Sequence, residues 1–177
     1  MGVGTADFST AMSTLWTASG LDGKFNALWD GEAASRRVAL ADLKSEFPTL
    51  HDGEATPKQP FPYCVMGVVK PRVLARMTGG EGSKRQINEF LVTLTVQASR
   101  RTGDARSAKQ IAAYLAEEIM KVLGGHPTVV PTDLTLENGG HLLAQLTGEW
   151  PERTEQYNYR WILNYRFLLD VPAAVAA

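Results

Sequence analysis

The chain holds few residues whose types and spacing could support catalysis or ligand binding. The best candidate is Thr78–Lys84, a glycine-rich segment that is superficially similar to a phosphate-binding loop. The motif G-x-x-x-x-G-K-[ST] is not met, because one residue separates Gly82 from Lys84. A phosphate loop must also open a helix, whereas an alternating strand pattern follows here. We therefore predict a hairpin loop at 78–87, whose Lys84 and Arg85 could contact an acidic partner.

The histidines and the cysteine show no arrangement typical of an active site. His51, His126 and His141 are far apart, and none belongs to an H-x-x-x-H or H-E-x-x-H pattern. Cys64 lies in an apolar segment, which indicates a small buried side chain rather than a reactive thiol. A single cysteine also excludes a disulfide within the chain. We predict no catalytic residue, no metal site and no cofactor.

Composition favours one globular domain, 1–177, with an ordered core at 5–171 and a flexible tail at 172–177. The formal net charge is −1, which argues against a protein that binds nucleic acid or membranes through its overall charge. The sequence contains no apolar run of about 20 residues, and its start has no signal-peptide pattern. We expect a protein that is made in a reducing cytoplasm.

The last long segment has the clearest alternation. From Tyr157 to Val171, apolar and aromatic residues occupy one parity, and mostly polar residues occupy the other. Successive side chains of a strand point to opposite faces, so the pattern predicts one strand with one buried face. At about 3.3 Å per residue such a strand is about 50 Å long, well beyond the usual length. We expect it to outrun its own core and to present its surplus length to a neighbouring molecule.

Two helices are predicted from capping residues and helical periodicity. A short N-terminal helix at 7–19 has Asp7 or Ser9 as its candidate cap. A long amphipathic helix is expected from an N-cap at Asp104 to Gly124–Gly125. Its apolar stripe, at i, i+3 and i+4 spacing, consists of Ala108, Ile111, Ala112, Leu115, Ile119 and Val122. We expect an α+β fold, in which both helices pack on one side of a mainly antiparallel β-sheet.

The other segments are assigned by alternation, proline and glycine. We expect a strand at 63–69 that is buried on both faces or in an interface, and an edge strand at 72–77. An alternating strand is expected at 88–98, and another strand at 141–147 after an Asn138–Gly140 turn. The segment 24–46 fits helix or strand, and 47–62 and 148–156 read as loops.

This order of elements resembles the tail-terminator proteins of long-tailed bacteriophages. The resemblance covers about residues 5–171 and rests on four features: the proline-rich entry into an apolar strand at Pro60–Gly67, the strand Phe90–Ala98, the helix opened by Asp104, and the pairing of Leu142–Trp150 with an aromatic strand around Trp161 and Tyr165–Phe167. It implies an α+β structural virion protein, not an enzyme.

In that family six copies form a ring that caps the finished tail tube, through which DNA passes. The resemblance therefore implies a homo-oligomer at the head-proximal end of a tail. The implied partners are the tail-tube protein and a neck or head-completion protein, with no membrane and no sequence-specific nucleic acid. The 78–87 hairpin and the 148–156 loop are then expected to reach along the ring axis. Our candidate interface residues are Lys84, Arg85, Arg72, Arg160, Arg166 and Trp150.

Three alternatives remain open at this point. The first is a head-completion or neck adaptor protein of the same virion. The second is a small-ligand-binding or enzyme domain, whose cavity is lined by Tyr157, Tyr159, Trp161 and Tyr165. The third is an RNA-binding sheet with stacking aromatics, which the near-neutral charge makes the weakest.

Overall fold

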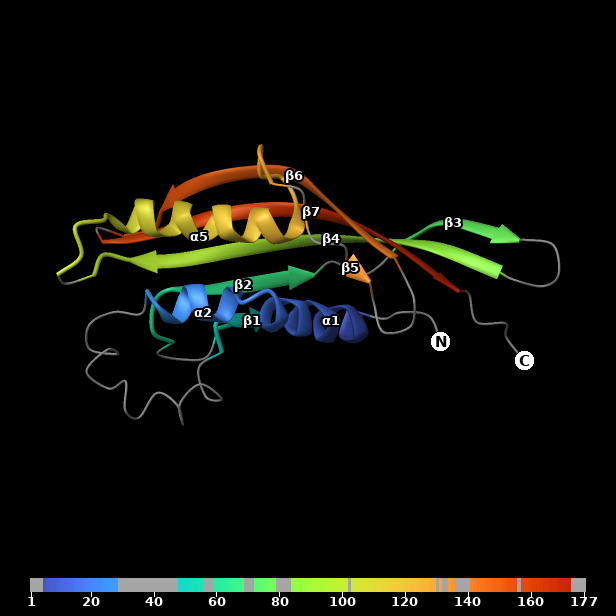
Figure 1. The fold of residues 1–177 in the computed structure, drawn as a ribbon, viewed down its shortest axis with the longest axis horizontal. Coiled ribbons are helices and arrows are strands. Elements are labelled where there is room, and N and C mark those ends of the chain that lie inside the picture. Colours follow the sequence, from blue (N-terminus) through green and yellow to red (C-terminus); the bar gives the residue numbers. More distant parts are fainter. Residues whose placement is uncertain are drawn as a thin grey trace.

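The computed structural model describes residues 5–28, 48–55, 59–68, 72–78, 84–101, 103–129, 131, 134–135, 141–155 and 157–172. Figure 1 shows an elongated molecule whose long strands run along its longest axis. Several predicted features lie outside the described residues: most of the 24–46 segment, the 79–83 part of the hairpin loop, the Asn138–Gly140 turn and the tail from 173 onward.

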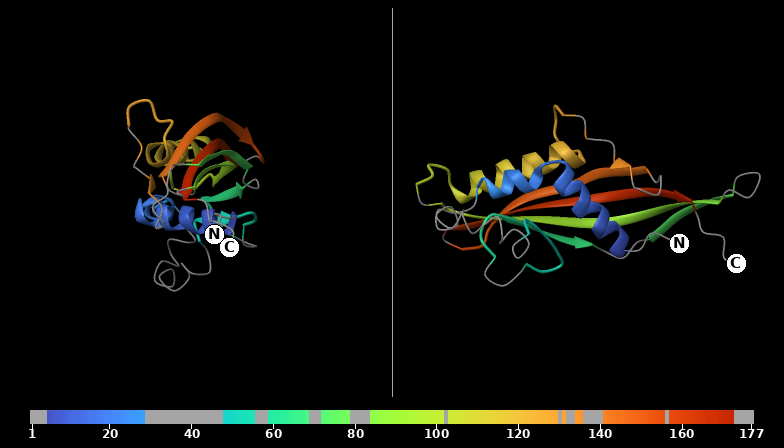
Figure 2. Two further views of the ribbon diagram at one scale, coloured as in Figure 1. Left: turned by 90° about the vertical axis from the view of Figure 1, so that its right-hand side faces the viewer. Right: turned by 60° about the horizontal axis from the view of Figure 1, so that its bottom comes forward.

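The described strands form one sheet in the order β1-β2-β4-β7-β6-β5, with β3 paired to β4 as well. Their bounds are β1 Leu50–Asp52, β2 Tyr63–Val68, β3 Arg72–Thr78, β4 Lys84–Ser99, β5 Leu134–Thr135, β6 His141–Arg153 and β7 Asn158–Pro172. Within the described part, every pairing is antiparallel except that of β1 with β2. The helices gather on one side of the curved sheet (Figure 2, left view), which confirms the predicted α+β class.

The long final strand is present, but it lies inside the sheet. It pairs with β4 from Arg85 opposite Pro172 to Ser99 opposite Asn158. On its other side it pairs with β6 from His141 to Arg153. Our expectation that its surplus length is offered to a neighbouring molecule is therefore wrong for the backbone, because both edges are bonded within the chain.

Helix α5, Ala108–Leu123, starts later than predicted because Ser107 is its N-cap. The Ser107 Oγ accepts the Gln110 N–H at 3.2 Å, and the Gln110 side chain accepts the Ser107 N–H at 2.8 Å. This reciprocal pair is a capping box. Asp104, the predicted cap, instead accepts the Arg106 N–H at 2.9 Å in the preceding turn. Gly124 ends the helix as predicted, at a φ of 106°.

The two N-terminal helices are α1, Thr5–Ala18, and α2, Leu21–Asn26. Asp7 and Ser9, the predicted caps, therefore lie inside α1 rather than at its start. A polar network fixes both helices to the segment before β1. The Trp16 Nε1 donates to the Thr49 Oγ1 at 3.0 Å, and the Thr49 hydroxyl donates to Asp22. These buried polar groups thus have partners, as burial requires.

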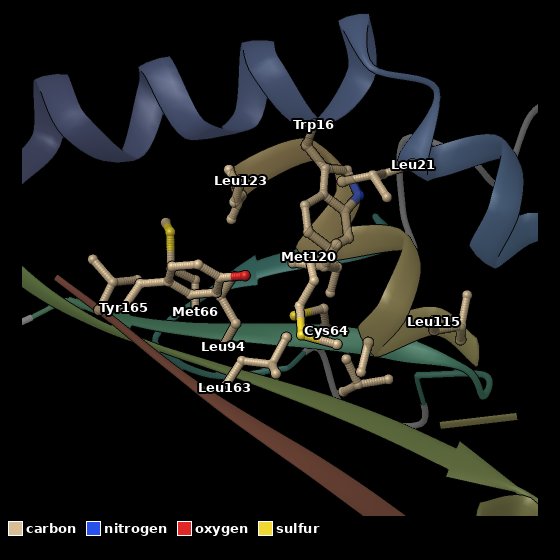
Figure 3. Packing of buried hydrophobic residues seen from close by; sticks show 14 of the residues in the cluster. Trp16, Leu21, Cys64, Met66, Leu94, Leu115, Met120, Leu123, Leu163 and Tyr165 are labelled. Atoms are coloured by element: carbon tan, nitrogen blue, oxygen red, sulfur yellow. The ribbon is translucent and has the colours of Figure 1, made fainter. Parts of the chain in front are cut away.

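The core lies between the helices and one face of the sheet (Figure 3). The strand side supplies alternate residues of β4 and β7, and α5 supplies its predicted stripe, of which only Val122 is partly exposed. In β7 the predicted buried face is confirmed at Leu163, Tyr165, Phe167 and Leu169. It fails directly before β7, where Tyr157 is 56% exposed and lines a cleft at the start of α5.

Several predicted boundaries were wrong. β4 begins at Lys84, so Lys84 and Arg85 belong to a strand rather than to a loop. β6 continues to Arg153, so most of the predicted 148–156 loop is strand. Strand β1 falls inside the predicted 47–62 loop. In β2 only Cys64 and Met66 are buried, which means that one face, not both, packs on the core.

Candidate functional site

The sheet face opposite the helices carries a buried carboxylate that joins three strands. We call this the outer face; it displays the odd-numbered residues of β4 and the even-numbered residues of β7. Glu89 of β4 is only 5% exposed. Its Oε2 accepts hydrogen bonds from the Arg72 Nη2 at 2.6 Å and the Arg72 Nε at 3.0 Å, and its Oε1 accepts one from the Arg166 Nε. One side chain of β4 thus anchors β3 and β7.

The two arginines also set the ionisation of Glu89. The hydrogen bond from Arg166, and then that from Arg72, hold the pKa of Glu89 below its ordinary value, although desolvation acts in the opposite direction. Arg72 and Arg166 were predicted as interface residues, and the structure brings them together around one carboxylate. The carboxylate therefore offsets one of their two positive charges, while the Arg72 side chain stays 71% exposed for further contacts.

Arg160 and Trp150 lie elsewhere on the same face. The Arg160 Nε donates to the Glu152 Oε2 at 2.7 Å across the β6–β7 pairing. Arg160 stands opposite Gln97 of β4, about 26 Å along the strand from Glu89 at about 3.3 Å per residue. Trp150, opposite Ile162, is 44% exposed. The six predicted interface residues therefore do not form one cluster.

Lys84 and Arg85 lie at the far end of the β3–β4 hairpin, where they pair with Thr78 and Met77. This hairpin projects beyond the helices at one end of the molecule (Figure 1). β3 exposes Val73 and Leu74 at 43% and 38%. The pairing register shifts between Val73 and Ala75, so Leu74 sits at a β-bulge.

The outer face and the sheet edges carry exposed apolar side chains. Leu91 of β4 and Leu143 of β6 are 48% and 64% exposed, and pairing through β7 places them on the same face as Trp150. β5 pairs with β6 only at His141 and Leu142, so the rest of β6 has one partner strand within the described part of the chain. β3 and β6 therefore expose edges on opposite sides of one sheet.

The described residues do not form a metal site: no three His, Cys, Asp or Glu side chains are placed to hold an ion. Cys64 is fully buried, and burial raises the pKa of its thiol, which disfavours the reactive thiolate. His51 is also buried, packs edge-on against Tyr63, and has its pKa lowered by desolvation. Among the helices that the structure describes, none is both long enough and apolar enough to cross a bilayer.

No protein-family model matches the chain, and no curated protein matches it in sequence. Among solved structures, the chain is similar to one described as "Virion of native gene transfer agent (GTA) particle". The two are 19% identical, the match covers 74% of this chain and 84% of the other, and the TM-score is 0.37. A score at this level indicates a loose likeness of fold and no more.

Sequence reasoning missed Glu89, which organises two of the predicted arginines. Its only signal was a charged residue on the polar parity of an alternating strand, which normally indicates a solvated side chain. The pairing that makes it a bridge joins β3, β4 and β7, and 77 residues separate Glu89 from Arg166. No local spacing encodes such a contact.

Proposed function

We propose that the chain is a structural protein of a virion, and specifically a tail terminator that forms a ring on the tail tube. The observation that carries the proposal is that, among the described residues, large apolar side chains are exposed on the outer face of the sheet and at both of its edges. Neighbouring subunits would remove these side chains from water, and we take them as support for an assembly. The solved structure that the chain is similar to is described as a gene transfer agent virion. The proposal does not depend on that match.

A ring requires a heterologous contact, in which one patch of a subunit meets a different patch of the next. The chain offers two such patches on opposite sides of the sheet. We call Val73 and Leu74 the β3 patch, and Leu143 and Trp150 the β6 patch. Regular strand addition is disfavoured at both, because β3 has its bulge at Leu74 and β6 has Pro151, which donates no hydrogen bond. The subunits therefore meet through side chains.

The projecting β3–β4 hairpin is the part of the subunit that we assign to the tail tube or neck. Glu89 ties the base of this hairpin to β7, so the hairpin is held to the sheet at its root. Lys84 and Arg85, at the far end of the hairpin, remain our candidate contacts with that partner. We propose no catalytic role for any of them.

The test is the mass of the purified chain by light scattering over a concentration series, with negative-stain images of the same fractions. A species of six times the chain mass with a central hole supports the ring. A monomer that is captured at the ends of added tail tubes supports a ring that needs its template. A monomer that ignores tubes and instead binds completed heads supports the second candidate, a head-completion or neck adaptor.

A further inference from the structure

A second candidate site lies at the end of the molecule opposite to the β3–β4 hairpin. There, the start of α5 faces the β6–β7 hairpin across a cleft of about 470 Å³. Figure 1 shows the end of β4, the start of α5 and the β6–β7 turn together at this end. The cleft is lined by Arg100, Arg106, Lys109, Arg153, Tyr157 and Tyr159, among others, and none of its lining residues is acidic.

The cationic side chains come from three separate segments. Arg100 follows β4, Arg106 and Lys109 flank the start of α5, and Arg153 ends β6. A backbone hydrogen bond of 3.0 Å, from the Arg100 N–H to the Tyr157 carbonyl, joins the first of these segments to the residue before β7. The positive charge is therefore built by the tertiary fold and does not come from a basic run in the sequence.

The cations differ in how far they are already neutralised. The Arg106 guanidinium is held by Asp104, through bonds of 3.1 Å from Nε and 2.8 Å from Nη2. Arg100 and Lys109 are exposed and form no ion pair within the described part of the chain. Part of the helix N-terminus is already occupied, because the capping box uses the Ser107 and Gln110 N–H groups. The side chains, not the helix N-terminus, make this an anion-binding surface.

The tyrosines add an apolar floor. They lie on the parity of β7 that forms the core further along the strand, but here α5 no longer covers them. Tyr157 is 56% exposed, which is high for a large aromatic side chain. An aromatic surface with arginines around it can hold an apolar group and bind carboxylates through forked hydrogen bonds.

We propose that this cleft binds an acidic, extended peptide segment of a partner protein; under the proposed function that partner is another protein of the particle. An enclosed pocket suits a small ligand by burying most of its surface. Here the cleft opens to solvent, with the Arg106 side chain 42% exposed, and its cations are distributed over three segments. Such a surface fits several carboxylates along a chain. A DNA duplex is too broad for a cleft of this size, and the net charge of −1 gives no general attraction for it.

Fluorescence anisotropy with fluorescein-labelled hexaglutamate tests the proposal on the full chain. We expect saturable binding that weakens as salt is raised. Arg100→Glu and Lys109→Glu should each weaken it by roughly tenfold or more, the size of one lost charge-assisted contact. Arg76→Glu is the matched control, since Arg76 is an exposed arginine of β3 at the other end of the sheet. Lys109→Glu places an acid in the first turn of α5, which favours the helix, so loss of binding would not reflect unfolding.

Three results would overturn the proposal: no binding of hexaglutamate to the full chain, equal weakening by Arg76→Glu, or displacement of the peptide by ATP or a 12-base-pair DNA at lower concentration than unlabelled hexaglutamate. Each of these results is independent of whether the chain forms a ring. Light scattering of the same variants reports assembly, so a chain that forms rings and ignores the peptide would refute only this inference.

Discussion

At the residue scale, Glu89 fixes the arrangement of two charged side chains on the outer face. Its carboxylate holds Arg72 and Arg166, so it fixes the direction of two side chains that could otherwise sample many rotamers. A buried carboxylate between two guanidinium groups is also hard to remove, since both arginines would lose their partner at once. We therefore regard Glu89 as the positioning residue of the β3–β4 hairpin.

Replacing Glu89 with glutamine should loosen that hairpin. The amide keeps the shape but loses the charge, so the bonds from both arginines weaken and the amides of β3 should exchange hydrogen several-fold faster with deuterium. The matched control is Glu152→Gln, because Glu152 also bonds an arginine but is 44% exposed, and exposed pairs contribute little. Equal protection of β3 in the wild type and in Glu89→Gln would contradict this role.

Asp104 gives a pH prediction at the same scale. The bonds from the Arg106 side chain and backbone lower the pKa of Asp104 to about 2. Because its folded pKa lies below its unfolded value, the stability it provides is complete above about pH 4 and is lost as pH falls through about 2. NMR titration of the side-chain carboxyl carbons should show this pKa, and Arg106→Gln should raise it towards its ordinary value. Lys109→Gln, which leaves the Asp104–Arg106 bonds intact, should leave it nearly unchanged.

At the element scale, the turn after α5 has little tolerance for a side chain. Gly125 has a φ of 103°, and a Cβ added there would lie 2.7 Å from the Leu146 Cδ2 and 3.0 Å from its Cβ. Gly125→Ala should cost about 2–4 kcal/mol, from the backbone conformation and from the clash with β6. Gly103→Ala is its control: Gly103 also has a positive φ, but an added Cβ would meet no atom within 4 Å, so we expect about 1 kcal/mol. Urea unfolding of both variants measures the difference.

The same elements show what could be predicted from the sequence. Local periodicity in the sequence predicts helix α5, the alternating strands β4 and β7, and the α+β class. The full length of β6 could not be predicted. Its register shifts between Leu146 and Gly148, which breaks the alternation, and Pro151 reads as a loop residue although it pairs opposite Trp161. Pairing with β7 overrides both signals.

The candidate sites depend even more on tertiary pairing. Arg72, Arg166 and Trp150 could be selected as exposed or polar-face residues, but the sequence did not indicate that the first two share Glu89. The aromatic run at the start of β7 was expected to be buried or to line a cavity. Both environments occur: Tyr165 is buried, with its hydroxyl donating to the Gly124 carbonyl at 2.8 Å, while Tyr157 and Tyr159 line the basic cleft. The position at which α5 begins over the sheet determines which tyrosines are buried and which line the cleft.

At the scale of the whole molecule, the β3 and β6 patches predict head-to-tail assembly. Two lysines placed in the β3 patch, by Val73→Lys and Leu74→Lys, should abolish the ring, because charged groups buried in a contact are costly. Leu143→Lys with Trp150→Lys in the β6 patch should do the same. All four side chains are exposed, so both double variants should keep the circular dichroism spectrum and thermal midpoint of the wild type. The control is Val129→Lys, since Val129 is 38% exposed and lies outside both patches.

Mixing the two double variants then separates head-to-tail contact from two-fold contact. The β3-patch variant keeps an unchanged β6 patch, and the β6-patch variant keeps an unchanged β3 patch. In a heterologous arrangement, the β6 patch of the first variant can bind the β3 patch of the second. The two patches that remain both carry lysines, so assembly stops there and the mixture should give dimers of one chain of each kind. Light scattering of each variant alone and of the mixture measures this. Dimers formed by either variant alone would mean that a patch meets its own copy. A ring that survives both pairs of substitutions would place the subunit contact outside both patches.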